Sequence, residues 1–99
     1  MTDQAMSERE QDLTLAAQDE MDRACTLVWR QIASHTPWGD TFEGFTPRGR
    51  EVAFERNYLW DDAPGEDVRV EVHVYEPQAY EAGVRLTRII ARASDPSGA

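Results

Sequence analysis

Residues 68–75, VRVEVHVY, place a valine at every second position. Successive side chains of an extended strand point to opposite faces, so Val68, Val70, Val72 and Val74 share one face. The intervening positions carry arginine, glutamate, histidine and tyrosine. One apolar face and one polar face are typical of an antiparallel strand that is half buried. The segment therefore predicts a strand whose valine face needs a covering layer.

A helical repeat in the N-terminal third of the chain can supply that layer. Ser7 and Glu10 form an S-x-x-E pattern, in which each side chain bonds the backbone N–H of the other residue. Apolar residues then recur at steps of three or four, as on one stripe of an amphipathic helix. The stripe consists of Leu13, Ala17, Met21, Ala24, Val28 and Ile32, with His35 at its end. Because Pro37 disfavours helical geometry at Thr36, we predict one long helix over residues 7–36.

Two other segments show the two-residue period, each with one interruption. The first has apolar residues at Val52, Phe54, Tyr58 and Trp60. Arg56 interrupts it, and Arg88 falls out of phase in the second segment, residues 84–90. A β-bulge near Arg88 would turn Ile89 inward. Together with the valine strand, these segments predict a three-stranded antiparallel meander over residues 49–93.

The predicted architecture is one α+β domain, with the long helix packed on the three-stranded antiparallel meander (αβββ). A chain of 99 residues has the ordinary length of a single domain. We expect a frayed start over residues 1–6 and a disordered tail over residues 94–99, because these ends have little to pack against.

The connection over residues 37–48 holds three large aromatic residues among prolines and glycines. These are Trp38, Phe42 and Phe45. In one interpretation the segment covers an open end of the core. In the other, exposed aromatics anchor a partner together with Arg48 and Arg50, because tryptophan and arginine are favoured at binding hot spots. Both hold if Phe42 and Phe45 are buried and Trp38 is the most exposed of the three tryptophans.

The charge balance limits the kinds of partner. Nineteen acidic residues face ten basic ones, which gives a net charge of −9. This disfavours direct binding to nucleic acid, which needs a basic surface. No apolar run approaches the roughly 20 residues of a membrane helix, and the N-terminus lacks the pattern of a signal peptide. We therefore expect a soluble, cytoplasmic protein that binds neither nucleic acid nor membrane.

The residues that usually carry catalysis are scattered. We expect His35 to be a cation at the helix end, His73 a surface histidine, and Cys25 a small core residue rather than a nucleophile. No metal-binding spacing is present, so we predict no metal, no cofactor and no enzymatic activity. Four acids lie close together, at Asp61, Asp62, Glu66 and Asp67. They lack the alternating spacing of a calcium loop and indicate a solvated turn.

We therefore expect a small acidic non-enzymatic protein that acts by contacting another protein. An inhibitor from a phage or mobile element, an immunity-type protein or an assembly factor would fit. The candidate contact residues are Trp38, Phe42, Arg48, Arg50, Asp61, Asp62, Glu66 and Asp67.

Two alternatives remain beside this expectation. The chain is a structural subunit that forms a homodimer or larger assembly through a sheet edge, or it binds a small molecule in a pocket lined by Trp60, Tyr58 and Trp29. An acidic DNA mimic is one form of the inhibitor. It requires the acidic first half of the helix and the acidic turn to lie on one side.

Overall fold

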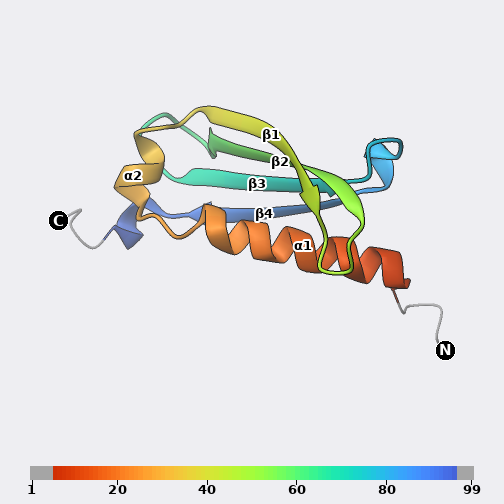
Figure 1. The fold of residues 1–99 in the computed structure, drawn as a ribbon. Coiled ribbons are helices and arrows are strands. Elements are labelled where there is room, and N and C mark those ends of the chain that lie inside the picture. The colour runs from red at the N-terminus through yellow and green to blue at the C-terminus, as the bar shows by residue number, and fades with distance from the viewer. Residues whose placement is uncertain (1–5, 96–99) are drawn as a thin grey trace.

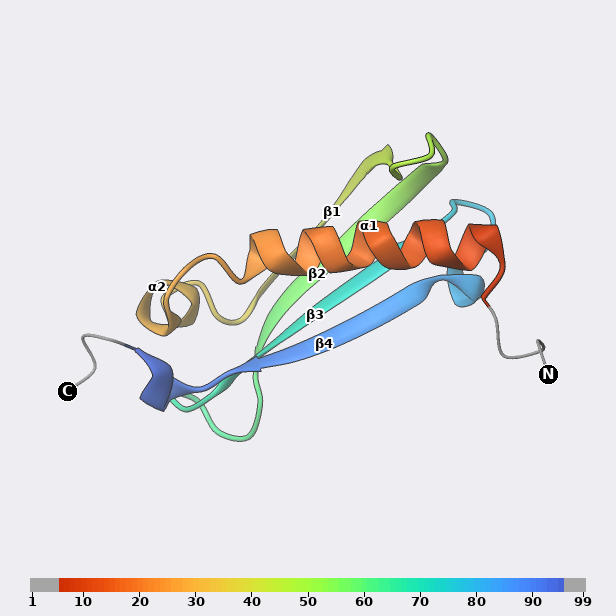
Figure 2. The ribbon, with the colours of Figure 1, turned by 90° about the horizontal axis from the view of Figure 1, so that it is seen from below.

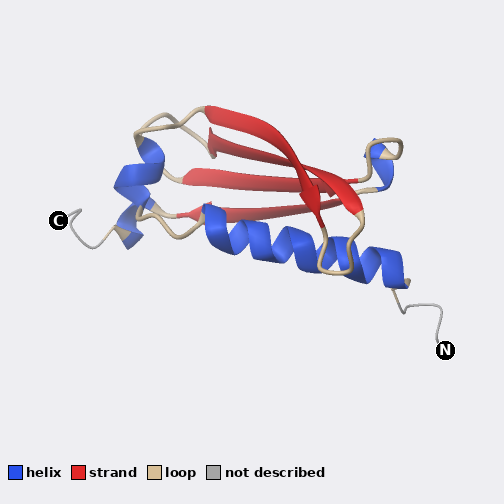
Figure 3. Cartoon of the chain, viewed as in Figure 1, coloured by secondary structure: helices blue, strands red, loops and turns tan. Residues whose placement is uncertain are grey.

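In the computed structural model, which describes residues 6–95, two helices lie on one face of an antiparallel sheet (Figure 1). The helices are α1 (Glu8–Ala24) and α2 (Trp29–Ala33), and the strands are β1 (Trp38–Phe45), β2 (Glu51–Trp60), β3 (Val68–Tyr75) and β4 (Val84–Ile90). Two short 3-10 helices, η1 (Tyr80–Ala82) and η2 (Arg92–Ser94), follow β3 and β4. The predicted α+β class, with a long helix on an antiparallel meander, is confirmed (Figure 3).

The sheet has four strands in the order β1-β2-β3-β4, so the predicted number of three is wrong. The additional strand, β1, is the segment that we predicted to be an irregular connection over residues 37–48. Two glycines hide its alternating pattern. A Cβ at Gly39 or Gly44 would crowd the side chain of Asn57 or Phe54 on the neighbouring strand. Because these positions must stay small, the two-residue period is not visible in the sequence.

The turn after β1 depends on Gly49, whose φ of +88° is a conformation that glycine adopts most readily. The N–H of Thr46 donates to the carbonyl of Arg50, and the N–H of Gly49 donates to the carbonyl of Thr46, both at 2.9 Å. A three-residue loop that ends in a left-handed glycine is a common hairpin connection. The sequence TPRGR is therefore a turn between two strands.

The predicted long helix is divided into α1 and α2. α1 begins as predicted: the hydroxyl of Ser7 accepts from the N–H of Glu10, and the carboxylate of Glu10 accepts from the N–H of Ser7, both at 3.1 Å. It ends at Ala24, where the hydroxyl of Tyr58 donates to the Ala24 carbonyl at 2.9 Å. The carbonyls of a last helical turn need such outside donors. Since Tyr58 is distant in sequence, the stripe alone could not reveal this end.

The capping box allows a prediction about stability. Ser7→Ala is expected to lower the free energy of unfolding by about 1 kcal/mol, because one backbone N–H at the start of α1 loses its acceptor. Chemical denaturation of the variant and the wild type measures this difference. A loss greater than that of Val70→Ala, which truncates a core side chain, would mean that Ser7 does more than cap α1.

The core lies between α1 and the face of the sheet that α1 covers, which we call the inner face. All four valines of β3 are buried there, as predicted. They meet the buried stripe of α1, which consists of Leu13, Ala17, Met21 and Ala24. The predicted contact between the valine face and the helix is therefore confirmed.

The predicted bulge near Arg88 is wrong. β3 and β4 pair without interruption, with Val70 opposite Arg88 and Val72 opposite Leu86. Arg88 therefore stays on the inner face, where its guanidinium lies 3.3 Å from the carboxylate of Asp22 on α1. An arginine is tolerated at this position because β4 is an edge strand and the long side chain reaches a carboxylate at its rim.

The structure describes neither residues 1–5 nor 96–99, so most of the predicted fraying over residues 1–6 and disorder over residues 94–99 lies outside the described residues. The prediction is wrong for residues 94 and 95. Ser94 belongs to η2, and Asp95 is buried with its carboxylate 3.6 Å from the guanidinium of Arg30.

Candidate functional site

The inner face of β1 and β2 is only partly covered. α1 packs chiefly on β3 and β4. In the view of Figure 2, parts of β1 and β2 extend beyond the helix. We call Trp38, Phe42 and Phe45, the three aromatic residues of β1, the aromatic edge. They lie along a strand that borders the open part of this face.

Two residues of the aromatic edge pack on aromatic rings of β2. Phe42 stacks on Phe54 with ring centres 5.0 Å apart, and Trp38 packs against Tyr58 at 5.3 Å. Trp38 remains 37% exposed and Phe45 is 69% exposed. Phe42 is half buried, in line with its expected covering role, whereas the expectation of a buried Phe45 is wrong.

Trp38 is the most exposed tryptophan, as predicted. Trp29 and Trp60 are both half buried. The indole N–H of Trp29 donates to the carbonyl of Glu66 at 2.9 Å, and its ring lies against the guanidinium of Arg92. Trp38 is thus the tryptophan best placed to contact another molecule.

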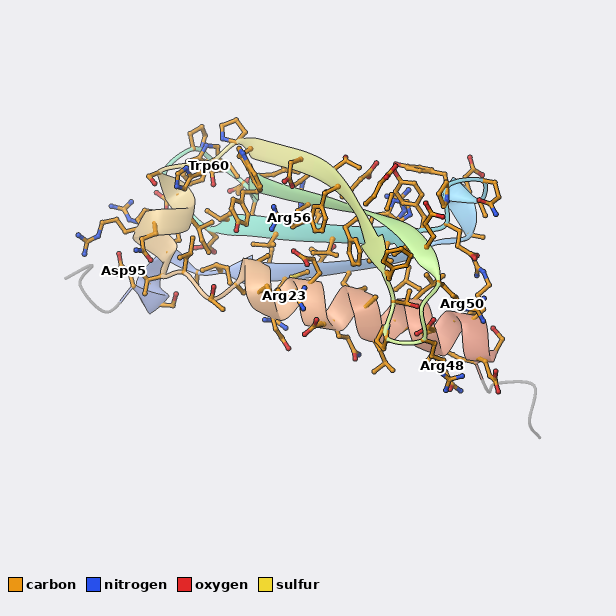
Figure 4. The ribbon with its side chains drawn as sticks, in the orientation of Figure 1. Arg23, Arg48, Arg50, Arg56, Trp60 and Asp95 are labelled. Atoms are coloured by element: carbon orange, nitrogen blue, oxygen red, sulfur yellow. The ribbon has the colours of Figure 1, made fainter. Side chains whose placement is uncertain are left out.

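Arg56 stands at the centre of this region (Figure 4). Its guanidinium lies over the rings of both Trp38 and Phe42, 5.2 and 4.9 Å from their centres. It bonds Asp40 through two nitrogens, at 3.0 and 2.8 Å, and Glu20 of α1 at 3.1 Å. The hydrogen bond with Asp40 raises the pKa of Arg56, so this side chain is a permanent cation. Arg56 therefore fixes β1 to β2 and to α1, and holds the aromatic edge in place.

Two shallow hollows lie beside the ends of the aromatic edge. One, of about 250 Å³, is lined by Leu27, His35, Trp38 and Tyr58. The other, of about 240 Å³, is lined by Ala16, Asp19, Arg23, Phe45, Thr46, Pro47 and Phe54. Of the residues predicted to line a small-molecule pocket, only Tyr58 lines either of these hollows.

Arg48 and Arg50 both lie near carboxylates of α1, and Arg48 remains exposed. The carboxylate of Asp12 on α1 is fully buried. It accepts hydrogen bonds from the Thr46 hydroxyl and, at 3.1 Å, from the N–H of Arg48. It also lies 3.2 Å from the Arg50 guanidinium. The Arg48 side chain lies 3.4 Å from Glu8. These contacts pin the β1–β2 turn to the first half of α1, as the labelled arginines in Figure 4 show.

The acidic turn, residues 61–67, is also tied to its surroundings. The Asp61 carboxylate lies 3.5 Å from the guanidinium of Arg69, and Asp67 accepts from the N–H of Arg92 at 2.9 Å. Glu66 lies 3.5 Å from the Arg92 guanidinium, whereas Asp62 is exposed. Three of these four acids therefore have local partners, which agrees with the interpretation as a solvated turn.

The structure separates the two acidic segments that a DNA mimic would need together. The start of α1 lies at one end of the molecule, beside the β1–β2 turn. The acidic turn lies at the other end, beside α2 and η2 (Figure 1). The two acidic segments therefore lie at opposite ends of the molecule.

His73 is buried, so the expectation of a surface histidine is wrong. It lies on the outer face of β3, 4% exposed, beneath the ring of Tyr80 and against Tyr75. Its Nδ1 is 3.5 Å from the carboxylate of Glu55. Burial, together with the nearby charge of Arg85, lowers the pKa of His73, so the imidazole is neutral near pH 7.

The lowered pKa predicts how stability depends on pH. Protonation is easier in the unfolded chain, so the contribution of His73 to stability is complete above about pH 6.5 and is lost as the pH falls below that value. Relative to His73→Phe, the wild type is expected to lose melting temperature on going from neutral to mildly acidic pH. Thermal melts at both pH values test this, and His35→Phe, which changes the exposed histidine, is the control. Parallel pH profiles for wild type and His73→Phe would contradict it.

Cys25 follows α1 and is packed against the core, as predicted. Its sulfur lies 3.6 Å from the sulfur of Met21, and burial raises the pKa of its thiol. A raised pKa disfavours the reactive thiolate.

Within residues 6–95, no cluster of three or more histidine, cysteine, aspartate or glutamate side chains is arranged to hold a metal ion. No helix in this range is long and apolar enough to cross a membrane.

Sequence reasoning missed two residues of the candidate site. Arg56 is separated from Val52, Phe54, Tyr58 and Trp60 by even numbers of residues. In a strand, this spacing indicates that it lies on the same face as these residues. Phe45 gave no comparable signal, because the face of the sheet on which it lies is defined only once β1 is recognised as a strand. No protein-family model, curated protein or solved structure matches this chain.

Proposed function

We propose that the chain is a small acidic non-enzymatic protein-binding module, acting as an inhibitor or assembly factor, and that the aromatic edge is its contact surface. The observation that carries this proposal is the exposure of Trp38 and Phe45 on one edge strand, with Trp38 against the fixed cation of Arg56. Tryptophan and arginine are enriched among residues that dominate binding energy.

The rigidity of the surface supports the same proposal. The Arg56 guanidinium is held by Asp40 and Glu20, and the ring of Trp38 contacts both Arg56 and Tyr58. A side chain that is already ordered loses little conformational entropy when a partner binds. The Trp38 ring is therefore already ordered in the free protein, so its binding to a partner loses little conformational entropy.

The experiment compares three tagged proteins as baits in an extract of the source organism, with quantitative mass spectrometry. The baits are the wild type, Trp38→Ala and Ile89→Ala. Ile89 is an exposed apolar residue on the far edge strand, so it controls for loss of any exposed apolar side chain. A specific partner should be recovered by the wild type and Ile89→Ala and lost with Trp38→Ala.

Trp38→Ala is expected to weaken affinity for such a partner by about 30-fold, corresponding to a hot-spot loss of about 2 kcal/mol. Its stability should fall by only about 1 kcal/mol, because the residue lies at an edge and is partly exposed. Melting and partner affinity are measured on the same preparation. A large loss of melting temperature would assign Trp38 to the core. Unchanged melting with unchanged affinity would place the contact surface elsewhere on the molecule.

A further inference from the structure

The two edge strands differ in what they offer to a further strand. β4 carries Arg85 and Arg88, and charged side chains on an edge discourage pairing with another chain. β1 contains no basic residue, and its two charges are Asp40 and Glu43. Since Asp40 is bonded to Arg56, the charge that remains along this edge is Glu43. β1 is the less protected edge of the sheet.

The backbone of β1 has a row of hydrogen-bonding groups that face away from β2. The N–H of Thr46 donates to Arg50 and so points toward β2, and the groups of an antiparallel strand alternate in direction. By this alternation, the residues whose N–H and C=O groups point outward are Gly39, Thr41, Glu43 and Phe45. No strand within residues 6–95 pairs with them.

We propose that this edge pairs antiparallel with β1 of a second copy of the chain, in the register that places Phe42 opposite Phe42 of the second copy. Thr41 then lies opposite Glu43 of the second copy, and Gly39 lies opposite Phe45. Every outward N–H and C=O of the strand gains a partner, because the outward residues pair among themselves. The two sheets become one continuous sheet with the β1 strands at its centre.

The neighbouring registers are less favourable. A shift in one direction places Glu43 opposite Glu43 of the second copy, and like charges directly opposite each other are destabilising. A shift in the other direction places Phe45 opposite Pro37, which has no N–H to donate. It also sets the charged Asp40 against Phe42. The sequence of β1 is therefore self-complementary in one register.

The side chains fit the same register. Phe45, although large and apolar, is the most exposed residue of the aromatic edge. On the outer face it would lie over Gly39 of the second copy, beside the Asn57 side chain that approaches this glycine from β2. An aromatic ring across from a strand glycine covers the backbone that the glycine leaves bare. On the inner face, Phe42 of each copy would form a cross-strand aromatic pair.

The inference goes beyond the proposed function and does not require the proposed partner. α1 leaves the inner face of β1 and β2 partly open in each copy. Pairing through β1 would join these two open faces into a single surface between the two α1 helices. A partner that contacts Trp38 would then meet Trp38 and Phe42 of both copies on one side of the assembly.

The pairing should be weak and reversible. Two paired strands bury less than the roughly 800 Å² per partner of a standard stable interface, so we expect a dissociation constant on the order of 10–100 µM. Each copy carries a net charge of −9. Because salt screens this mutual repulsion, self-association should tighten as salt is added. Binding to a basic partner would show the opposite dependence on salt.

Sedimentation equilibrium of the purified full chain tests the proposal, over a range of micromolar concentrations at low and high salt. Thr41→Pro removes an outward N–H and is expected to weaken self-association by at least about tenfold. Proline is tolerated in an edge strand where the N–H faces solvent, so the monomer should remain folded. Thermal melting checks this.

Thr87→Pro is the matched control. Thr87 is an exposed threonine on β4. The N–H of Asp61 donates to the carbonyl of Asp67, so the odd-numbered residues of β3 bond β2 and the even-numbered residues bond β4. The even-numbered residues of β4 therefore bond β3, and the N–H of Thr87 points to solvent. This variant should associate like the wild type. A wild type that stays monomeric at every concentration, association that weakens with salt, or equal losses in both variants would overturn the proposal.

Disulfide trapping tests the register independently. In a Cys25→Ser background, Phe42→Cys should form a disulfide-linked dimer when treated with diamide. Residues opposite each other in a pair that exchanges no hydrogen bonds have Cα atoms about 4.5 Å apart, within the disulfide range. Thr41→Cys, one residue away, would have its copies separated by about 7–8 Å and should cross-link at least about tenfold more slowly. Equal rates would overturn the register.

Both measurements use the purified chain alone. Their failure would leave the proposed contact with another protein standing, since that contact is tested in extract through Trp38→Ala. Loss of the partner contact would in turn leave self-association through β1 unaffected.

Discussion

Val72→Asp is expected to unfold the domain. Val72 lies in the middle of β3, is 1% exposed, and stands between Val70 and Val74 on the face that α1 covers. An unpaired carboxylate at such a site costs several kcal/mol, which is comparable with the whole stability of a small domain. Circular dichroism and thermal melting of the purified variant should show no cooperative transition.

One possible rescue of this variant can be judged from the structure. Arg56 lies directly opposite Val72 on β2, so a cation is close to the new carboxylate. That cation already bonds Asp40 and Glu20, and a third carboxylate would compete for the same donors. We therefore expect no full rescue.

Thr87→Asp is the control for this experiment. Thr87 is exposed on the outer face of the neighbouring strand β4, opposite Glu71. An aspartate at this exposed position should not prevent folding, so the thermal unfolding of Thr87→Asp should remain cooperative. A soluble Val72→Asp protein that melts cooperatively would mean that the valine face of β3 is not the buried face.

The parts of the fold that could be predicted are those with local and repeated signals. The valines of β3 repeat at every second residue, and the Ser7–Glu10 pair sits directly before the helical stripe, so both elements were found. The end of α1 could not be found in this way. Its last carbonyl accepts a hydrogen bond from Tyr58 in β2, and no local pattern reports a contact between distant segments.

β1 was missed for a different physical reason. Its glycines at positions 39 and 44 make room for side chains of β2, and removing side chains removes the pattern that identifies a strand. The prediction that two arginines break the apolar alternation is wrong. Arg56 and Arg88 lie on the inner face and reach carboxylates of α1, Glu20 and Asp22. A charged residue in phase with apolar neighbours is thus consistent with the strand period when a partner is in reach.

The candidate site was only partly predictable. The predicted exposure of Trp38, which rests on its position just after the helices and before a glycine, is confirmed. The roles expected for Arg48 and Arg50 as partner contacts did not anticipate their bonds to Asp12 and Glu8. A buried carboxylate attracts the nearest available cations, and only the packing of α1 against the β1–β2 turn shows which cations those are.

Arg56→Met is expected to destabilise the protein by about 3 kcal/mol. The substitution keeps an unbranched side chain but removes the charge that bonds Glu20, whose carboxylate is only 2% exposed. Breaking a buried pair by removing one partner leaves an uncompensated charge and typically costs about 3–5 kcal/mol. The lower value applies because Glu20 keeps a second contact, at 3.2 Å, with the exposed Arg23. Urea denaturation measures the difference.

The double variant Glu20→Met/Arg56→Met separates the cost of a stranded charge from the value of the pair. Replacing both members of a buried pair by apolar residues of similar size is often neutral or stabilising, so the second substitution should restore most of the lost stability. Asp40, which also bonds Arg56, is partly exposed and can be solvated by water. If the double variant were less stable than Arg56→Met, the ion pair itself would stabilise the fold. Arg56 would then be required for the packing of α1 on the sheet, and not only for neutralising Glu20.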